Sequence, residues 1–319
     1  MKFPRRLGAA FGLSTAVAFS LVSLPPGAYA TTVSEPLSTS LSTSAAPLPD
    51  FTANATSEEL HLDAASVPGV GSLAETGVGP VSGSVGGSPK VDSSVSNLDA
   101  DLLSTGNKGL LTQLEQTAPP DNAAPAGKDF LSTNLSPLVS IGTSTATAQS
   151  RWNEAGSCLA PGTAISSAHI ETAGLGLAGS SLLGGDLLHV DSVQSDEKVS
   201  LTGPDSGRTV TSTATGSTAS IALLGGAVKI DVAKNPTLTA KATGHASGAS
   251  VGWTSPVLTV TAAGKSYTLD SANPSVNVGV PGVANVELSL GDLMNVVKSD
   301  DGTKASADAR LLHLKVTAL

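Results

Sequence analysis

From residue 130 to residue 319, apolar residues alternate with Thr and Ser in short runs that Gly, Pro, Asn and Asp separate. The clearest runs are 138–149, 164–173, 238–243, 257–261, 275–280, 283–290 and 309–316. A period of two, rich in β-branched residues and bounded by turn residues, is typical of half-buried strands. We therefore predict an all-β, antiparallel sandwich-like domain of roughly ten to twelve short strands, either as one domain or as two subdomains.

Turn residues between these runs favour hairpins. Residues 182–185 read Leu-Leu-Gly-Gly, and the same four residues recur at 223–226, each time before an alternating run. A Gly-Gly pair between apolar residues favours a two-residue type I′ turn, because both central positions need a positive φ. We predict two antiparallel hairpins related by duplication, and further hairpin turns at 262–265 and 299–303.

The first 30 residues have the pattern of a secretory signal peptide. Lys2, Arg5 and Arg6 precede an apolar stretch from 7 to 24, and Ala-Tyr-Ala at 28–30 forms a cleavage site. That stretch is diluted by Ser, Gly and Thr, which disfavours a membrane anchor. We predict cleavage after Ala30, by the general or the twin-arginine route, and a cell-surface or extracellular protein. Past this leader, no segment approaches the ~20 apolar residues of a membrane span.

Residues 31–129 have a different composition, dominated by Ser, Thr, Gly, Ala and Pro, with Phe51 as the one aromatic residue. Such a segment buries too little apolar surface to offset the entropy of ordering it. We predict a disordered, low-complexity stalk that contains short ordered pieces. Residues 98–116 have near-helical apolar spacing, which favours one short amphipathic helix.

The order of these segments carries a family resemblance. Small residues, Leu-Leu-Gly-Gly and an alternating Val/Ile run follow a signal peptide and a low-complexity stalk, and over 139–260 this pattern resembles the "choice-of-anchor P" surface proteins of high-GC Gram-positive bacteria. The resemblance implies a surface or extracellular location and no defined enzymatic role. That family is named for variable C-terminal anchors, and we recognise no such motif in this sequence.

Charge excludes several classes of partner. The chain has 17 Lys and Arg against 26 Asp and Glu, and removal of Lys2, Arg5 and Arg6 with the leader would change the net charge from −9 to −12. Nucleic acids and anionic lipids are both bound by Lys and Arg that replace counterions. We therefore expect neither as a partner, and expect instead a cell-wall component or another protein.

Two short motifs copy nucleotide-binding sites. Residues 174–179 satisfy G-x-G-x-x-G, with Asp196 about 20 residues on, but a dinucleotide site needs a helix to open at that turn. Here the sequence continues into the predicted Gly-Gly hairpin. Residues 264–266 copy the end of a P-loop, but Thr259 stands where that motif has Gly. We interpret both motifs as strand and turn, and predict no cofactor.

Candidate catalytic and metal-binding residues are few. His245 and Ser247 lie two residues apart in a predicted loop, and His189 shares a strand face with Asp191. Carboxylates group as Asp186, Asp191, Asp196 with Glu197, and Asp300 with Asp301. Without a Ca²⁺-loop motif, we interpret these acids as solvated turn and strand residues, with loop-bound Ca²⁺ as the alternative. We assign no catalytic or metal site.

Cys158 is the single cysteine, so the chain forms no internal disulfide, and the alternatives are a buried thiol or a disulfide-linked dimer. Trp152 and Trp253 are the two tryptophans, and we expect them to anchor a core.

The sequence leaves three functional readings. We favour a non-enzymatic secreted or surface protein that displays a β-domain to a wall component or partner. An exported hydrolase would need a cleft lined by two or more of Asp191, Asp196, Glu197, Asp300 and His189. A glycan- or Ca²⁺-binding module would need Trp152 or Trp253 exposed in a groove. Strand addition at sheet edges is a further hypothesis for partner binding or polymerisation.

Overall fold

The computed structural model describes thirteen stretches of the chain: 10–12, 14–21, 51–57, 60–62, 65–67, 71–73, 76–86, 90–100, 113–135, 139–153, 159–177, 186–203 and 208–318. The regular elements of these stretches are β-strands, and the sheets are antiparallel, which confirms the predicted fold class. Within the same stretches, no helix has the length and apolar character needed to cross a membrane.

Two sheets form the first layer. Sheet D has the order β12 (Ala126–Phe130), β15 (Ser144–Ser150), β16 (Ala164–Thr172), β19 (Val193–Thr202), β20 (Thr209–Thr218), β23 (Thr237–Ala242) and β24 (Ser250–Thr254). Sheet E has the order β13 (Thr133–Leu135), β14 (Val139–Ile141), β17 (Leu175–Leu177), β18 (Leu188–Val190), β21 (Ser220–Leu223), β22 (Val228–Lys234), β25 (Val257–Ala262) and β26 (Lys265–Leu269). The chain passes from D to E and back, so the layer is a single meander.

Two further sheets form the second layer. Sheet B has the order β11 (Gln113–Ala118), β9 (Val91–Ser96), β8 (Val81–Val85), β3 (Phe51–Ser57), β2 (Ser14–Leu21), β30 (Lys304–Arg310) and β29 (Leu293–Lys298). Sheet A has the order β10 (Leu98–Ala100), β7 (Thr76–Val78), β4 (Leu60–Leu62), β1 (Ala10–Gly12), β31 (Leu312–Ala318), β28 (Ala284–Leu290) and β27 (Ser275–Val280). A small sheet C pairs β5 (Ala65–Val67) with β6 (Gly71–Leu73).

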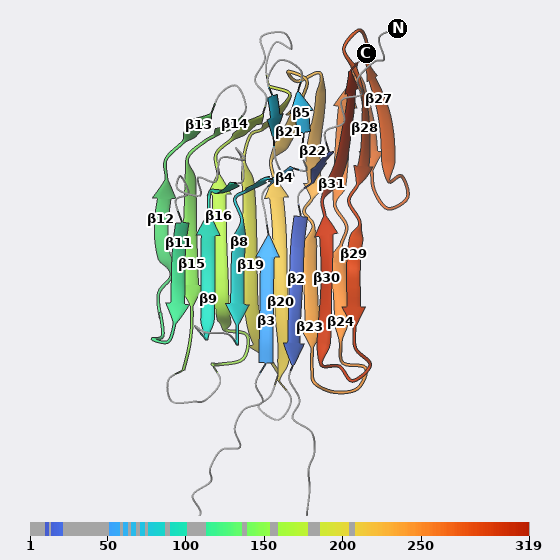
Figure 1. Cartoon of the computed structure of the whole chain (residues 1–319). Coiled ribbons are helices and arrows are strands. Elements are labelled where there is room, and N and C mark those ends of the chain that lie inside the picture. Colours follow the sequence, from blue (N-terminus) through green and yellow to red (C-terminus); the bar gives the residue numbers. More distant parts are fainter. Residues whose placement is uncertain are drawn as a thin grey trace, which may run out of the picture.

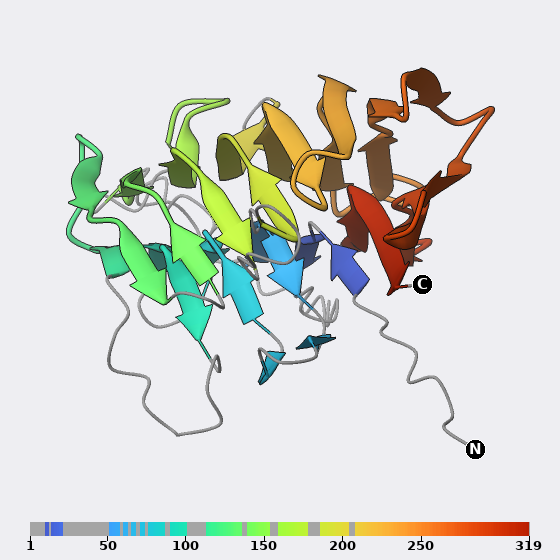
Figure 2. The ribbon, with the colours of Figure 1, turned by 90° about the horizontal axis from the view of Figure 1, so that it is seen from above.

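The layers pack face to face, sheet B on sheet D and sheet A on sheet E (Figures 1 and 2). Strands β1 and β2 join the two ends of the chain in the second layer. β2 lies between β3 and β30, and β1 lies between β4 and β31. The N-terminal and C-terminal parts of the chain therefore share both sheets of this layer.

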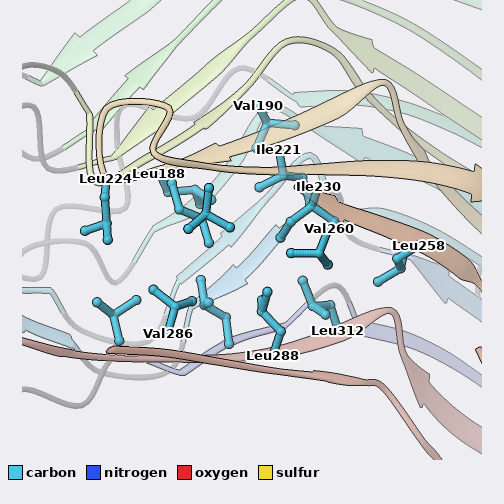
Figure 3. Close-up of a cluster of buried hydrophobic side chains, with 14 of the residues drawn as sticks. Leu188, Val190, Ile221, Leu224, Ile230, Leu258, Val260, Val286, Leu288 and Leu312 are labelled. Atoms are coloured by element: carbon cyan, nitrogen blue, oxygen red, sulfur yellow. The ribbon is translucent and has the colours of Figure 1, made fainter. Parts of the chain in front are cut away.

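The two halves of the sandwich have different cores. Between sheets E and A, Leu, Ile and Val from both layers interdigitate, among them Ile230, Leu258 and Leu288 (Figure 3). Between sheets D and B the buried residues are smaller, and alanines predominate on β3, β30 and β23: Ala53, Ala55, Ala305, Ala307, Ala309, Ala240 and Ala242. Where small buried residues alternate with outward polar residues, the two faces of a strand differ little in hydrophobicity. Such strands therefore resemble low-complexity sequence.

Most predicted strands and turns are confirmed. The run 164–173 contains β16, 257–261 lies in β25, 275–280 coincides with β27 and 283–290 contains β28. Residues 299–303 form the turn from β29 to β30, where the Gly302 amide donates to the Ser299 carbonyl at 3.0 Å. The turn at 262–265 has the type I′ conformation, with φ of 49° at Ala263 and 74° at Gly264.

The repeated Leu-Leu-Gly-Gly differs from its predicted turn. Its second copy connects β21 to β22 through a four-residue turn, and Leu224, Gly225 and Gly226 all have positive φ. The amide of Leu224 donates to the carbonyl of Leu187 at 2.9 Å, which ties the turn to the start of β18. The hairpins β17–β18 and β21–β22 lie side by side, because β18 pairs with β21. The first copy itself, at 182–185, lies outside the described residues.

One prediction for the N-terminal part needs correction. The amphipathic helix at 98–116 is wrong, because residues 98–100 form β10 and residues 113–116 belong to β11, which pairs with β9. In the range 31–129, β3, β8, β9 and β11 supply four of the seven strands of sheet B. The boundary at 129/130 falls inside β12. Segments rich in Ala, Ser and Gly can form these strands because such small residues fit between closely packed sheets.

We expect Gly264→Ala to destabilise the protein by about 1 kcal/mol, because an L-residue at this positive φ is strained even though a Cβ would meet no atom of the described residues within 4 Å. Gly252→Ala, in β24, is the matched control: its Cβ also meets no atom within 4 Å, and its φ lies outside the left-handed region. Urea unfolding should show the loss for Gly264→Ala alone. Equal stability of the two variants would contradict the assigned turn.

Candidate functional site

The outer face of sheet D presents rows of polar side chains that lie in register across the strands. Thr147, His169, Asp196 and Thr215 stand opposite one another on β15, β16, β19 and β20. The next row contains Gln149, Ser167, Lys198 and Thr213. An open groove is lined by residues of both rows, among them Thr147, His169, Asp196, Lys198 and Thr213. We call this surface the D face; it can offer hydroxyl groups and one ion pair to a ligand.

His169 and Asp196 form the central ion pair of the D face. His169 Nδ1 lies 2.7 Å from Asp196 Oδ1, and the two side chains are 35% and 47% exposed. The hydrogen bond to Asp196 raises the pKa of His169 above its usual value, burial opposes that rise, and the charges of Asp196 and Glu171 add to it. A raised histidine pKa means that the pair stabilises the fold at low pH. This contribution is lost as the pH rises through the pKa of His169 in the folded protein.

We expect Asp196→Asn to lower the pKa of His169 toward its ordinary value, because the variant loses the charged partner that favours the imidazolium. An NMR titration of the ring protons measures this directly. Asp186→Asn, which removes the carboxylate beside His189 instead, is the matched control and should leave His169 unchanged. A His169 titration that is the same in Asp196→Asn and the unaltered protein would contradict the pairing.

Glu197 follows Asp196 on β19 but points the other way, into the space between sheets D and B, where it is 3% exposed. Ser166 Oγ donates to Glu197 Oε1 at 2.8 Å, while Oε2 has no hydrogen-bond partner among the described residues. Burial raises the pKa of Glu197 to about 8; the Ser166 hydrogen bond opposes this shift, and the charge of Asp92 adds to it. The carboxyl group is therefore neutral at pH 7.

Ser166 belongs to a chain of hydroxyl groups that links the two layers. Ser93 Oγ on β9 lies 2.8 Å from Ser166 Oγ, and Ser150 Oγ on β15 donates to Ser93 Oγ at 2.9 Å. Gly83 on β8 lies directly over Ser166 and the carboxylate oxygens of Glu197, with no room for a Cβ atom. This polar cluster is enclosed by both sheets, so its evident role is in packing the layers.

His189 forms a second surface group, on the outer face of sheet E. Its Nδ1 lies 3.2 Å from Asp186 Oδ2 and its Nε2 lies 3.4 Å from Asp191 Oδ1. The shared face of His189 and Asp191 is as predicted. Ser220 also donates to Asp191 Oδ2. In the described residues, no three His, Cys, Asp or Glu side chains are grouped so that they could hold a metal ion.

A hydrolase cleft would need two or more of five candidate residues, and the fold distributes these five over different surfaces. Asp196 lies on the outer face of sheet D, Glu197 lies between the layers, and His189 and Asp191 lie on the outer face of sheet E. Asp300 lies in the turn from β29 to β30, where its carbonyl accepts from the Ser247 amide at 2.8 Å. Asp196 and Glu197 both border the groove on the D face. The five residues as a set do not line one cleft.

The turn acid Asp301 is structural. Its Oδ1 accepts hydrogen bonds from the backbone amide and the hydroxyl of Thr303, at 3.0 and 2.7 Å. Hydrogen bonds from Ser299 and Thr303 lower the pKa of Asp301 to about 2. This arrangement shapes the hairpin at 299–303.

The other candidate residues occupy structural positions. His245 and Ser247 lie in the loop from β23 to β24, with φ of 61° at Ser247. Trp152 and Trp253 are partly buried and pack against the core between sheets D and B, as expected for core anchors. Residues 175–177 of the G-x-G-x-x-G motif form β17, and 264–266 lie in the β25–β26 hairpin. Cys158 lies outside the described residues.

The sequence pattern does not predict the pairing of His169 with Asp196, because the two residues are 27 positions apart and their contact depends on the register of β16 with β19. The burial of Glu197 did leave a signal. Val193, Ser195, Glu197 and Val199 alternate with polar residues along β19, which puts Glu197 on the apolar side of the strand.

Comparisons with protein-family models, with curated proteins and with solved structures find no match to this chain. We therefore base the functional proposal on the leader-like N-terminus and on the surfaces described above.

Proposed function

We propose that this protein is exported and acts as a non-enzymatic surface or secreted protein, whose β-sandwich presents the D face to a cell-wall component or a protein partner. The N-terminal pattern of three cations, an apolar stretch and Ala-Tyr-Ala supports export. The resemblance of 139–260 to the choice-of-anchor P surface proteins supports the same location.

The observation that carries the proposal is the D face itself. Hydroxyl-bearing residues from β15, β16 and β20 lie in register across the sheet, around the His169–Asp196 pair and Lys198 of β19. Such a repeated set of donors and acceptors on rigid strands suits an extended ligand, either a glycan chain or a peptide. The net charge of −12 expected after cleavage favours uncharged or cationic ligands.

Fractionation of the producing cells into medium, wall, membrane and cytoplasm tests the proposal. We expect the protein in the wall or the medium, and we expect the purified protein to sediment with isolated wall material or to capture a surface protein. Thr213→Glu should weaken this binding, because it places a charge in the D face. Thr259→Glu, on the outer face of sheet E, is the matched control and should bind as the unaltered protein does.

Two results would contradict the proposal. Retention of the protein in the cytoplasm would contradict the proposed export. Binding that Thr213→Glu and Thr259→Glu leave equally intact would remove the D face as the binding surface. Each variant needs an unfolding curve to show that its fold is unchanged.

A further inference from the structure

Strand β2 occupies a central position that the proposed export would empty. It pairs with β3 from Thr15 opposite Ser57 to Leu21 opposite Phe51, and with β30 from Ser14 opposite Arg310 to Ser20 opposite Lys304 (Figure 1). Both neighbours are antiparallel to β2 along nearly its whole length. β2 also lies within the predicted signal peptide, so this inference rests on the proposed export.

Removal of residues 1–30 would leave a slot one strand wide between β3 and β30. Its sides carry the buried alanines Ala53 and Ala55 on β3 and Ala305 and Ala307 on β30, and Leu238 on β23 belongs to the same core cluster. Along both sides, the backbone N–H and C=O groups that pair with β2 would lose their partners. Unpaired backbone groups next to an apolar core are costly, so such a slot favours the addition of another strand.

The register of β2 indicates which pattern of residues fits the slot. Val17 stands opposite Ala55 and Ala307, and Phe19 stands opposite Ala53 and Ala305, so these odd-numbered positions share the face of the buried alanines. The even-numbered positions are Ser or Ala. The slot therefore fits an extended eight-residue segment that alternates larger residues with small ones.

The mature chain would carry such a segment near its new N-terminus. Residues 38–45 read Ser-Thr-Ser-Leu-Ser-Thr-Ser-Ala, and β2 reads Ser-Thr-Ala-Val-Ala-Phe-Ser-Leu. Aligned from end to end, the two share Ser-Thr at the start, a branched apolar residue at the fourth position and Ser at the seventh. In this register Leu41 takes the place of Val17, opposite Ala55 and Ala307.

The sequence after this segment indicates which copy receives it. Residues 45–50 read Ala-Ala-Pro-Leu-Pro-Asp, directly before β3. A residue before proline is restricted to extended conformations, so this alternation of prolines disfavours the tight reversal that would return 38–45 to the slot of its own copy. We propose that residues 38–45 of one mature copy fill the slot between β3 and β30 of a second copy, so that copies assemble head to tail by strand addition.

A double-cysteine variant, Leu41→Cys with Ala307→Cys in a Cys158→Ser background, tests the proposal when it is secreted through its own leader. Directly opposite residues of antiparallel strands have Cα atoms about 4.5–5.5 Å apart, which a disulfide can span. We expect a ladder of disulfide-linked dimers and larger species on a non-reducing gel. Ser40→Cys with Ala307→Cys is the matched control, and should give no ladder because position 40 faces away from position 307.

A monomer with an internal disulfide would overturn the proposal, because the segment would then fill its own slot, and so would the absence of any disulfide. Leu41→Asp, with no introduced cysteine, gives an independent measurement. We expect light scattering to show assemblies for the unaltered mature protein and monomers for Leu41→Asp, and monomers in both would overturn the proposal. Intact mass distinguishes failure of the proposed export from failure of the proposed assembly. A chain that keeps residues 1–30 contradicts the proposed export. A cleaved chain that stays monomeric contradicts strand addition alone.

Discussion

Replacing Glu197 by glutamine is expected to remove a large part of the pH dependence of stability between pH 4.5 and 8. In the folded protein burial raises the pKa of this carboxyl group to about 8, whereas its ordinary value is 4.5. Glutamine keeps the size of the side chain and an oxygen that can accept from Ser166, and it has no proton to lose.

The sign of the effect is set by proton binding. Below pH 4.5 the carboxyl group is protonated in both the folded and the unfolded state, so its ionisation does not change the free energy of unfolding. Between pH 4.5 and 8 the unfolded chain releases a proton that the folded protein retains, so stability falls as the pH rises. At about 1.4 kcal/mol per pKa unit, the loss across this window is on the order of 4–5 kcal/mol.

Urea unfolding at half-unit pH steps measures this effect. Glu171→Gln, which removes an exposed carboxyl group on the neighbouring strand β16, is the matched control and should keep the fall in stability. If the unaltered protein and Glu197→Gln showed the same slope against pH, Glu197 would be ionised in the fold, and its burial between the layers would be contradicted.

The second large effect is expected from Gly83→Ala. The added Cβ would overlap Ser166 Oγ and both carboxylate oxygens of Glu197, and neither group can move freely because the opposing sheets enclose them. Forcing the layers apart or breaking the Ser166–Glu197 hydrogen bond should cost about 3 kcal/mol or more. Gly127→Ala, whose Cβ would lie 3.9 Å from the Ala146 carbonyl oxygen in ordinary contact, is the control and should change little.

A double-mutant cycle identifies the cause of this loss. Glu197→Ala creates space beneath position 83, so Gly83→Ala should cost less in that background than alone. Additive effects would mean that Gly83 does not pack on Glu197, and would contradict the assigned contact between β8 and β19.

The strands that the sequence predicts best are those with bulky residues. In β25 and β28, Leu and Val alternate with Thr, Ser, Asn or Glu, and Ala263-Gly264 supplies the turn after β25. The contrast between the two faces is large there, because these strands build the aliphatic core between sheets E and A.

Sequence patterns are less informative where the buried residues are small. β8 reads Val-Ser-Gly-Ser-Val and has Gly83 on its buried face, so its alternation is hidden in a Ser- and Gly-rich segment. β11 lies in a segment whose Leu spacing suited a helix, and only its pairing with β9 decides in favour of a strand. The D face depends on register between distant strands, which no local pattern specifies.

The N-terminus of the exported protein provides the most direct test of the proposed export and assembly. Residues 14–21 belong both to the predicted leader and to the central strand β2, which are incompatible roles. We propose that the leader role prevails on export. Intact-mass analysis of the protein recovered outside the cells should give a chain that begins at Thr31. A chain recovered there with residues 14–21 still attached would contradict this proposal, because β2 would then be a permanent strand and the slot between β3 and β30 would not exist.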